Sequence, residues 1–212
     1  MAEQKSVADT DVRPPMPAYQ RERRKRIVAA ARAALDEQEY EQIQMRDVAA
    51  RADVALGTLY RYFGSKEHLY AAVMLDWIRP LHDDRRVRGA TPRSAAERLR
   101  RRVHASISAF EQHPQYFKVL MLLTHTADER ARELYVEFSG ISMRSLSREL
   151  DMLGGQQAED MTMMIWSTFT TMLTASIYHG RSLRDLYRVC DSLIDLIEPK
   201  LREAEAAAEA PA

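Results

Sequence analysis

The chain has 212 residues, enough for one large domain or two small ones, and its 46% apolar and 29% charged composition is typical of a folded protein. Seven glycines and eight prolines leave few helix breakers, which favours an all-α fold over a parallel sheet with glycine-rich phosphate loops. The 31 basic and 31 acidic residues cancel, so a nucleic-acid partner must be inferred from local patterns. The one cysteine, Cys190, excludes an internal disulfide and a cysteine-based zinc site.

The first 17 residues form a polar leader that ends in a proline-rich stretch. Residues 1–13 lack the apolar core of a secretory signal, and a single cysteine in the whole chain suits a reducing compartment. We therefore expect a cytoplasmic protein in which residues 1–17 form a disordered arm.

Residues 18–81 are predicted to form an amino-terminal domain of four helices. In the first helix, Ile27, Ala31 and Leu35 fall on one face. Ser65 is a good N-cap for the fourth helix, which Pro80 must end or kink. The predicted helices cover residues 18–38, 46–52, 56–63 and 66–80.

A second helical domain, residues 90–198, is predicted to follow an arginine-rich linker. The pair Thr91-Pro92 is a strong helix start, because the hydroxyl caps the helix while proline occupies its first position. The apolar residues from Leu99 to Phe110 mark the helix that follows, and Pro114 breaks it. Later helices are predicted at 116–123, 130–153 (closed by Gly154 and Gly155), 161–178 and 183–197, before an Ala/Glu tail at 199–212.

The predicted helix from Met161 to Tyr178 contains no charge over eighteen residues, the minimum length for a membrane span. Seven of the eighteen are Ser or Thr, a weakly apolar composition for hydrocarbon, so a span is the disfavoured alternative. A helix that is apolar nearly all round is buried on both sides, and the last helix adds a wide apolar stripe. These two helices are expected to form a homodimer, with Met172, Leu186, Leu193 and Ile197 in the interface.

The segment QMRDVAARADVALGTLYRYFGSK, residues 44–66, is the most informative part of the sequence. Two short helices joined by a three- or four-residue turn form a helix-turn-helix, whose second helix enters the DNA major groove. At roughly 100° per residue, Leu56, Leu59 and Phe63 are expected to point together into the core.

The opposite side of this second helix is predicted to face DNA. It carries Gly57, Thr58 and Arg61, with Tyr60 and Tyr62 on the flanks. Small, hydrogen-bonding side chains around a glycine can approach phosphates and base edges closely. A solvated role for Arg61 and packing of Tyr60 against the first helix are the alternatives.

The pattern V-x-x-G-T-L-Y-x-Y-F-x-S-K, preceded by R-x-V-A-x-R-A, resembles the TetR family of bacterial transcription regulators. The match is dense from Arg21 to Leu81, and the run QRERRKRI together with QMR and RADVALGTLYRYF resembles the KstR-type actinobacterial repressors of sterol catabolism. The resemblance implies a two-domain helical fold: a three-helix DNA-binding domain with its motif at residues 44–63, and a larger ligand-binding and dimerisation domain. It also implies a homodimeric repressor of a pseudo-palindromic operator in double-stranded DNA, released by an apolar small molecule, either a lipid or a sterol-derived acyl-CoA.

Family roles can be carried onto the matching positions. By resemblance, Arg46 would reach a base edge, Thr58 and Tyr60 would contact a base or a phosphate, and Tyr62 and Lys66 would hold phosphate. Lys66 lies at a helix N-terminus, where backbone N–H groups and the cation can act on one phosphate together. The predicted DNA-binding set is Arg24, Arg46, Gly57, Thr58, Tyr60, Arg61, Tyr62 and Lys66.

Two residues depart from the family pattern, and one cluster lies beside it. Gln44 stands where many members place a Thr or Ser cap, so the second helix has a poorer cap. Asp53 replaces a turn glycine, but Asp tolerates the left-handed conformation better than most residues. Five cations lie between Arg21 and Arg26, which predicts sequence-independent DNA affinity, with a solvated helix face as the alternative.

An effector pocket is expected where the fourth helix meets the second domain. A methionine cluster that includes Met143 and Met164 offers adaptable apolar side chains, although ordinary core packing is the alternative. The resemblance implies a thioester effector whose nucleotide lies near the cations between Arg79 and Arg102. The expected pocket residues are Trp77, Phe110, Met121, Phe138, Met164 and Phe169.

Three other classes of function are weaker alternatives. A helical metalloenzyme needs paired Glu-x-x-His motifs, and no histidine here has an acidic residue three positions before it. We therefore expect no catalytic residue, no metal and no cofactor. A membrane-surface protein that uses the arginines from Arg79 to Arg102, and a constitutive DNA-binding protein without a ligand, are the remaining alternatives.

Overall fold

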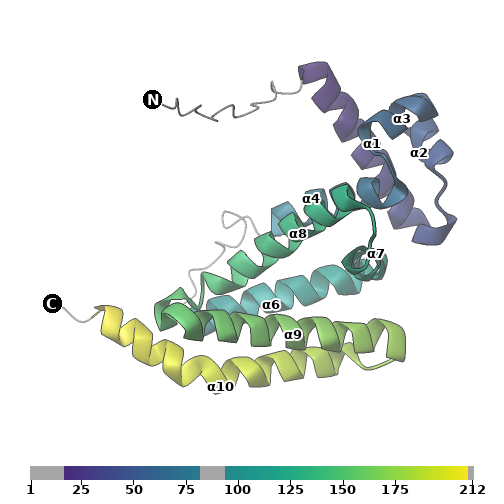
Figure 1. Cartoon of the computed structure of the whole chain (residues 1–212). Coiled ribbons are helices and arrows are strands. Elements are labelled where there is room, and N and C mark those ends of the chain that lie inside the picture. Colours follow the sequence, from purple (N-terminus) through teal and green to yellow (C-terminus); the bar gives the residue numbers. More distant parts are fainter. Residues whose placement is uncertain (1–16, 82–93, 210–212) are drawn as a thin grey trace, which may run out of the picture.

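The computed structural model describes residues 17–81 and 94–209, and within these ranges the chain contains helices and no strand (Figure 1). The predicted all-α fold is confirmed. The expected arm, apart from Pro17, and the expected helix start at Thr91-Pro92 lie outside the described residues.

The amino-terminal domain follows the predicted helix pattern to within one residue at each end. Ile27, Leu35, Leu59 and Phe63 are fully buried and form its core together with Leu69. Its elements are α1 (Ala18–Glu37), the 3₁₀ turn η1 (Tyr40–Gln42), α2 (Met45–Arg51), α3 (Leu56–Tyr62) and α4 (Lys66–Leu81).

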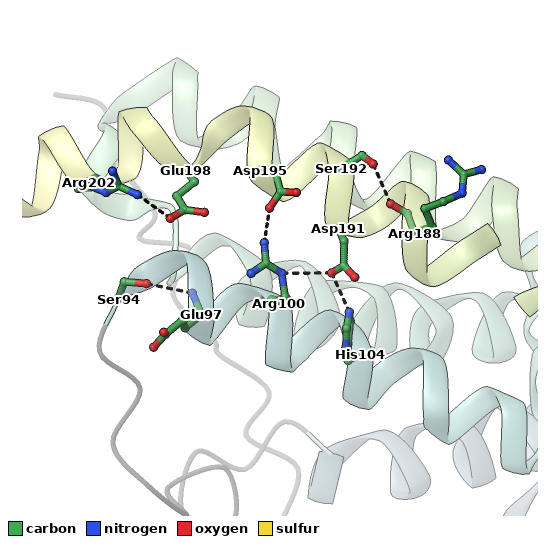
Figure 2. A network of polar contacts seen from close by, with 10 residues as sticks. All are labelled: Ser94, Glu97, Arg100, His104, Arg188, Asp191, Ser192, Asp195, Glu198 and Arg202. Carbon is green, nitrogen blue, oxygen red and sulfur yellow. Dashed lines mark hydrogen bonds and ion pairs between the residues drawn. The ribbon is translucent and has the colours of Figure 1, made fainter. Parts of the chain in front are cut away.

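The second domain packs its helices against one another and against α4. Its elements are α6 (Ala95–Gln112), α7 (Pro114–Thr124), α8 (Glu129–Ser147), the 3₁₀ turn η2 (Asp151–Leu153), α9 (Gly155–His179) and α10 (Leu183–Glu209). The helix break at Pro114 is confirmed. Figure 1 shows α9 and α10 side by side, and α8 against α4. Figure 2 shows how α6 is tied to α10: Arg100 and His104 contact the carboxylate of Asp191, with His104 Nε2 lying 2.8 Å from Asp191 Oδ1.

Three helix boundaries differ from the sequence expectation. The predicted helix 130–153 ends at Ser147, whose hydroxyl donates a hydrogen bond of 2.8 Å to Asp151 at the start of η2. Gly154 and Gly155 then take positive φ values of 75° and 36°, which lets the chain turn directly into α9. As a result α9 begins six positions before the predicted residue 161.

The last helix continues through Pro199 to Glu209, where the sequence predicts a tail. Leu201 is buried, and the Glu205 carboxylate accepts a hydrogen bond of 2.6 Å from the Ala95 backbone N–H. Arg98 lies 3.7 Å from the same carboxylate. These contacts to the start of α6 compensate for the hydrogen bond that proline removes from the helix interior.

The charge-free part of α9, residues 161–178, bonds several of its hydroxyl groups within the helix. Thr162, Thr170 and Thr174 each donate to the carbonyl four residues earlier, at 2.7 to 2.9 Å. Such bonds let Ser and Thr lie in a helix with an apolar environment. Within the described ranges, no helix combines the length and the apolar character that a membrane crossing requires.

The two domains are joined through linked helix caps. The Ser65 hydroxyl accepts a hydrogen bond of 2.9 Å from the His68 backbone N–H, so the predicted N-cap of α4 is confirmed. The same hydroxyl donates at 2.5 Å to Asp128, whose carboxylate in turn caps α8 by accepting from the Ala131 N–H at 2.9 Å. A second junction joins α1 to α7, where Tyr116 donates to Asp36 at 2.8 Å.

Candidate nucleic-acid interface

The turn between α2 and α3 has the conformation that the sequence predicts. Asp53 adopts φ 52°, in the left-handed region, and the Val54 N–H donates to the Ala49 carbonyl at 3.0 Å. Arg26 Nη1 lies 3.8 Å from the Asp53 carboxylate. Asp53 therefore takes the left-handed conformation of the turn between α2 and α3, a position that glycine often occupies.

The outer side of α3 is open. A Cβ atom on Gly57 would meet nothing within 4 Å, and Tyr60 and Arg61 are exposed. Thr58 is half-buried, and its hydroxyl accepts a hydrogen bond of 3.5 Å from Arg61. These groups form a surface that another polar molecule can approach closely.

Leu56 does not belong to the core, contrary to the sequence expectation. Its side chain is 41% exposed, whereas Leu59 and Phe63 are fully buried. Leu56 is the first residue of α3, and the core of the domain is formed by the later residues Leu59 and Phe63. Leu56 therefore adds an apolar contact to the same outer face.

Arg46 extends from the start of α2. Its side chain is 78% exposed, and its Nε lies 3.5 Å from the neighbouring Asp47 carboxylate. Gln44 makes no side-chain hydrogen bond to the helix end, as expected of a poor cap. The guanidinium is free to reach outward from the first turn of the helix.

A groove of about 410 Å³ lies between the start of α1 and the end of α3. Its lining consists of Tyr19, Gln20, Arg23, Arg24, Arg61 and Tyr62, none of which is acidic. The Arg24 guanidinium lies 5.1 Å over the Phe63 ring, and burial lowers its pKa. Three arginines beside two tyrosines suit a phosphodiester backbone. In the sequence, Arg23 stands out only as a member of the Arg21–Arg26 cluster, and sequence reasoning missed Tyr19 and Gln20. The run of charges identified the segment but not which side of α1 meets α3.

Lys66 is directed inward, toward the core of its own domain. Its ammonium donates to the Tyr40 carbonyl and lies 4.2 Å from the centroid of the Tyr40 ring, and burial lowers its pKa. The phosphate contact expected from the sequence requires Nζ to leave Tyr40. The side chain therefore fastens η1 to the start of α4 in this structure.

An apolar cavity of about 30 Å³ lies among α4, α6, α8 and α9. Three of the expected pocket residues line it, namely Phe110, Phe138 and Phe169. The sequence did not single out Ile165 and Trp166 from α9, because the whole helix is apolar and its cavity side carries no separate signal. The remaining lining residues are Ile78, Arg102, Val103, Ser106, Ser142 and Leu146.

The other three expected pocket residues lie elsewhere. Trp77 packs against Phe110, with ring centroids 5.0 Å apart, and does not line the cavity. Met121 Sδ lies 3.9 Å from the Thr174 hydroxyl, and Met164 is 51% exposed on α9. The cavity is therefore lined by aromatic side chains, and no methionine is among its lining residues.

Three arginines of the expected basic mouth are engaged by carboxylates, although Arg102 also lines the cavity. Arg98 and Arg102 both donate to the buried Glu149 at 2.7 Å. Arg100 contacts Asp191 at 3.2 Å (Figure 2). Residues 82–93 of the same basic stretch lie outside the described residues. The described part of the chain holds no group of three or more His, Cys, Asp or Glu side chains arranged for a metal.

Of the four expected dimer residues, Leu186 and Ile197 are buried in the core that α10 shares with α6 and α9. Met172 and Leu193 are half-buried at its edge. The apolar residues that α9 and α10 expose are Met163, Met164, Tyr178 and Leu196, and Leu196 is 76% exposed. The stripe that was expected to form the dimer interface is thus partly used for packing within the chain, and the outer face carries a different set of apolar residues.

Comparison with protein families and curated proteins places the amino-terminal domain. Residues 27–73 match the model of the bacterial regulatory proteins, tetR family. The transcriptional repressor KstR of Mycobacterium tuberculosis is 53% identical over 76 residues, which is 34% of each chain. KstR of Mycolicibacterium smegmatis is 60% identical over 55 residues, 26% of this chain and 27% of the relative. The chain thus matches about a third of the length of these relatives or less.

Solved structures match over both domains. A TetR transcriptional regulator from Rhodococcus sp. RHA1 has a TM-score of 0.67 at 24% identity, covering 84% of this chain and 96% of that one. FadR from Bacillus subtilis, in complex with stearoyl-CoA, has a TM-score of 0.62 at 20% identity, covering 82% and 96%. FadR from Thermus thermophilus, in complex with lauroyl-CoA, has a TM-score of 0.67 at 18% identity, covering 81% and 92%. The shared feature at these identities is the fold.

Proposed function

From the premise that residues 27–73 form a DNA-binding domain of the tetR family, we propose that this protein is a transcriptional repressor that a coenzyme A thioester releases from DNA. The observation that carries the DNA-binding part is the open face of α3, with Gly57, Thr58 and Tyr60 beside the arginine-lined groove. The repressor assignment is supported by the similarity to KstR in this domain.

The protein binds its operator as a homodimer in this proposal. The exposed apolar residues of α9 and α10, above all Leu196, supply a self-complementary surface. Two recognition helices about 34 to 36 Å apart then enter successive major grooves, so the operator is two-fold related. Arg46 and Thr58 read bases, while Tyr62 and the groove of Arg23 and Arg24 hold phosphates.

The effector proposal rests on the apolar cavity and on the FadR structures, which contain bound stearoyl-CoA and lauroyl-CoA. A cavity of about 30 Å³ is far below the roughly 300 Å³ or more of a ligand pocket, so an acyl chain must part the helices around it. Ile78 of α4 lines the cavity, and only three residues separate α4 from the end of α3. Movement of α4 away from α8 would therefore move the recognition helix α3.

The experiment has two stages. Genomic DNA fragments retained by the purified protein are sequenced, and a two-fold related motif is expected. Lauroyl-CoA, stearoyl-CoA and cholanoyl-CoA are then titrated against the protein–DNA complex by fluorescence anisotropy. Linkage requires that the effector weaken DNA binding by the same factor by which DNA weakens effector binding. If every thioester binds with equal affinity in the presence and absence of operator, the proposed effector regulation is wrong and the DNA-binding function stands alone.

A further inference from the structure

A second groove, of about 420 Å³, lies between the two domains, where α1 meets α4 and α8. Arg24 and Lys25 of α1 form one wall, and Asp76 and Arg79 of α4 lie beside Glu137 of α8. This groove shares Arg24 with the DNA-facing groove and has no other lining residue in common with it. Its α1 and α4 residues belong to the amino-terminal domain, and its α8 residues, Leu134 and Glu137, come from the second domain.

The charges in this interdomain groove are incompletely balanced. Three cations and two carboxylates line it, and Arg79 Nη2 lies 2.9 Å from Glu137 Oε1. Both side chains of this pair are about half exposed, so water and other anions can compete for them. Lys25 also lies 4.0 Å from the exposed Glu22 carboxylate on its own helix. Burial lowers the pKa of Arg24, as does the nearby Arg79 cation, while the Asp76 and Glu137 carboxylates partly offset this. An additional anion in the groove relieves that repulsion.

The groove adjoins the apolar cavity along the contact between α4 and α8. On α4, Ile78 lines the cavity and its neighbour Arg79 lines the groove. On α8, Phe138 lines the cavity and its neighbour Glu137 lines the groove. A ligand with an apolar chain and an anionic head can therefore occupy both spaces by passing between these two helices.

We propose that the interdomain groove binds the phosphate groups of the coenzyme A thioester whose acyl chain enters the cavity, an inference that rests on the proposed function. The phosphates take the place of Glu137 on Arg79 and gain Lys25 from the other wall. The ligand head is then held partly by α1, an element of the DNA-binding domain. Binding therefore couples to the position of α1 directly, in addition to the parting of α4 and α8.

The test compares two substitutions that break the same ion pair. Arg79→Gln removes a cation that would hold phosphate, and we expect it to weaken binding of the tightest of lauroyl-CoA, stearoyl-CoA and cholanoyl-CoA about tenfold. Glu137→Gln removes the competing carboxylate, and we expect it to tighten the same binding several-fold. Opposite signs separate ligand contact from simple loss of the ion pair, which would change both variants alike.

Controls distinguish the phosphate groups from the acyl chain. The N-acetylcysteamine thioester of the same acid has no phosphate, and its affinity is expected to be equal in wild type, Lys25→Gln and Arg79→Gln. Arg188→Gln, which removes an exposed, carboxylate-paired arginine of α10, should leave both ligands unaffected. Isothermal titration calorimetry measures all combinations, and thermal unfolding checks that each variant folds.

The outcomes separate this inference from the function on which it rests. Equal affinity of wild type, Arg79→Gln and Lys25→Gln for the CoA thioester would overturn the groove assignment alone. A parallel loss for the phosphate-free thioester would do the same. If none of the three CoA thioesters binds the wild-type protein, the effector class is wrong and the groove assignment fails with it.

Discussion

Two pairs of arginines, one in each domain, lie in opposite environments. In the amino-terminal domain, Arg46 and Arg61 project into solvent from α2 and α3. In the second domain, Arg98 and Arg102 both donate hydrogen bonds to Glu149, which is only 6% exposed. One pair is exposed on the proposed DNA-binding face, and the other pair joins α6 to Glu149. A cluster of basic residues in a sequence therefore predicts a binding surface only when the opposing carboxylates are known to be elsewhere.

The largest expected effect comes from removing the carboxylate at the centre of the second pair. Glu149→Ala leaves Arg102, whose side chain is 10% exposed, without its main counter-charge, and loss of one partner of a buried pair costs about 3 to 5 kcal/mol. Urea unfolding measures the change. The matched control is Asp195→Ala, which removes the exposed partner of Arg100 and should cost about 1 kcal/mol or less. Similar losses for the two variants would contradict the contrast between buried and exposed pairs.

The dimer surface provides the next largest effect. Leu196 is exposed on α10, so Leu196→Glu should leave the fold of the single chain intact while placing a charge in the proposed interface. We expect the variant to sediment as a monomer and to lose operator affinity by one to two orders of magnitude, because two half-sites are no longer bound by one particle. Val136→Glu replaces another exposed apolar residue, on α8, and should sediment like wild type. If the wild-type protein sediments as a monomer at micromolar concentration, the proposed dimer interface is wrong.

Arg46 tests the opposite pair of arginines. Arg46→Ala should reduce operator binding by about 1 to 3 kcal/mol at one base-pair position and leave stability unchanged, since its side chain is 78% exposed. Anisotropy titrations against operator and against random DNA measure the difference. Equal losses on the two DNAs would assign Arg46 to phosphate binding. Arg23→Ala, in the groove beside α3, is the comparison that should lose affinity for both DNAs alike.

The features that the sequence predicted well are local. Two examples are the core spacing of Leu59 and Phe63 and the left-handed turn at Asp53, both of which depend on neighbouring residues. The structure confirms both. The four helices of the first domain follow from the same kind of signal. Apolar periodicity and turn chemistry act over a few residues, so one sequence contains enough information to specify them.

The features that were missed depend on contacts between distant segments. The turn of Lys66 toward Tyr40, and the helix that passes through Pro199, are both set by partners many positions away. The burial of Leu186 follows from the packing of α10 on α6. The apolar stripe of α10 was visible in the sequence, but the identity of the surface that covers it was not.

The smallest expected effect concerns the cap that joins the two domains. Ser65→Ala removes the acceptor for the His68 N–H and the donor to Asp128, and loss of a serine cap costs about 1 kcal/mol. Ser94→Ala is the matched control, because Ser94 caps α6 by accepting from Glu97 N–H at 3.2 Å within one domain (Figure 2). We expect similar losses of stability for the two variants at neutral pH.

The two variants should separate in acid. The Ser65 hydroxyl, followed by the Ala131 backbone N–H, holds the pKa of the Asp128 carboxyl below its ordinary value. A lowered pKa contributes stability above the unfolded value, roughly pH 4, and that contribution disappears as the pH falls through the folded value. The cost of Ser65→Ala should therefore shrink as the pH falls below roughly 4, whereas the cost of Ser94→Ala should stay nearly constant. Parallel pH profiles from urea unfolding would show that the Ser65–Asp128 bond contributes nothing beyond an ordinary cap.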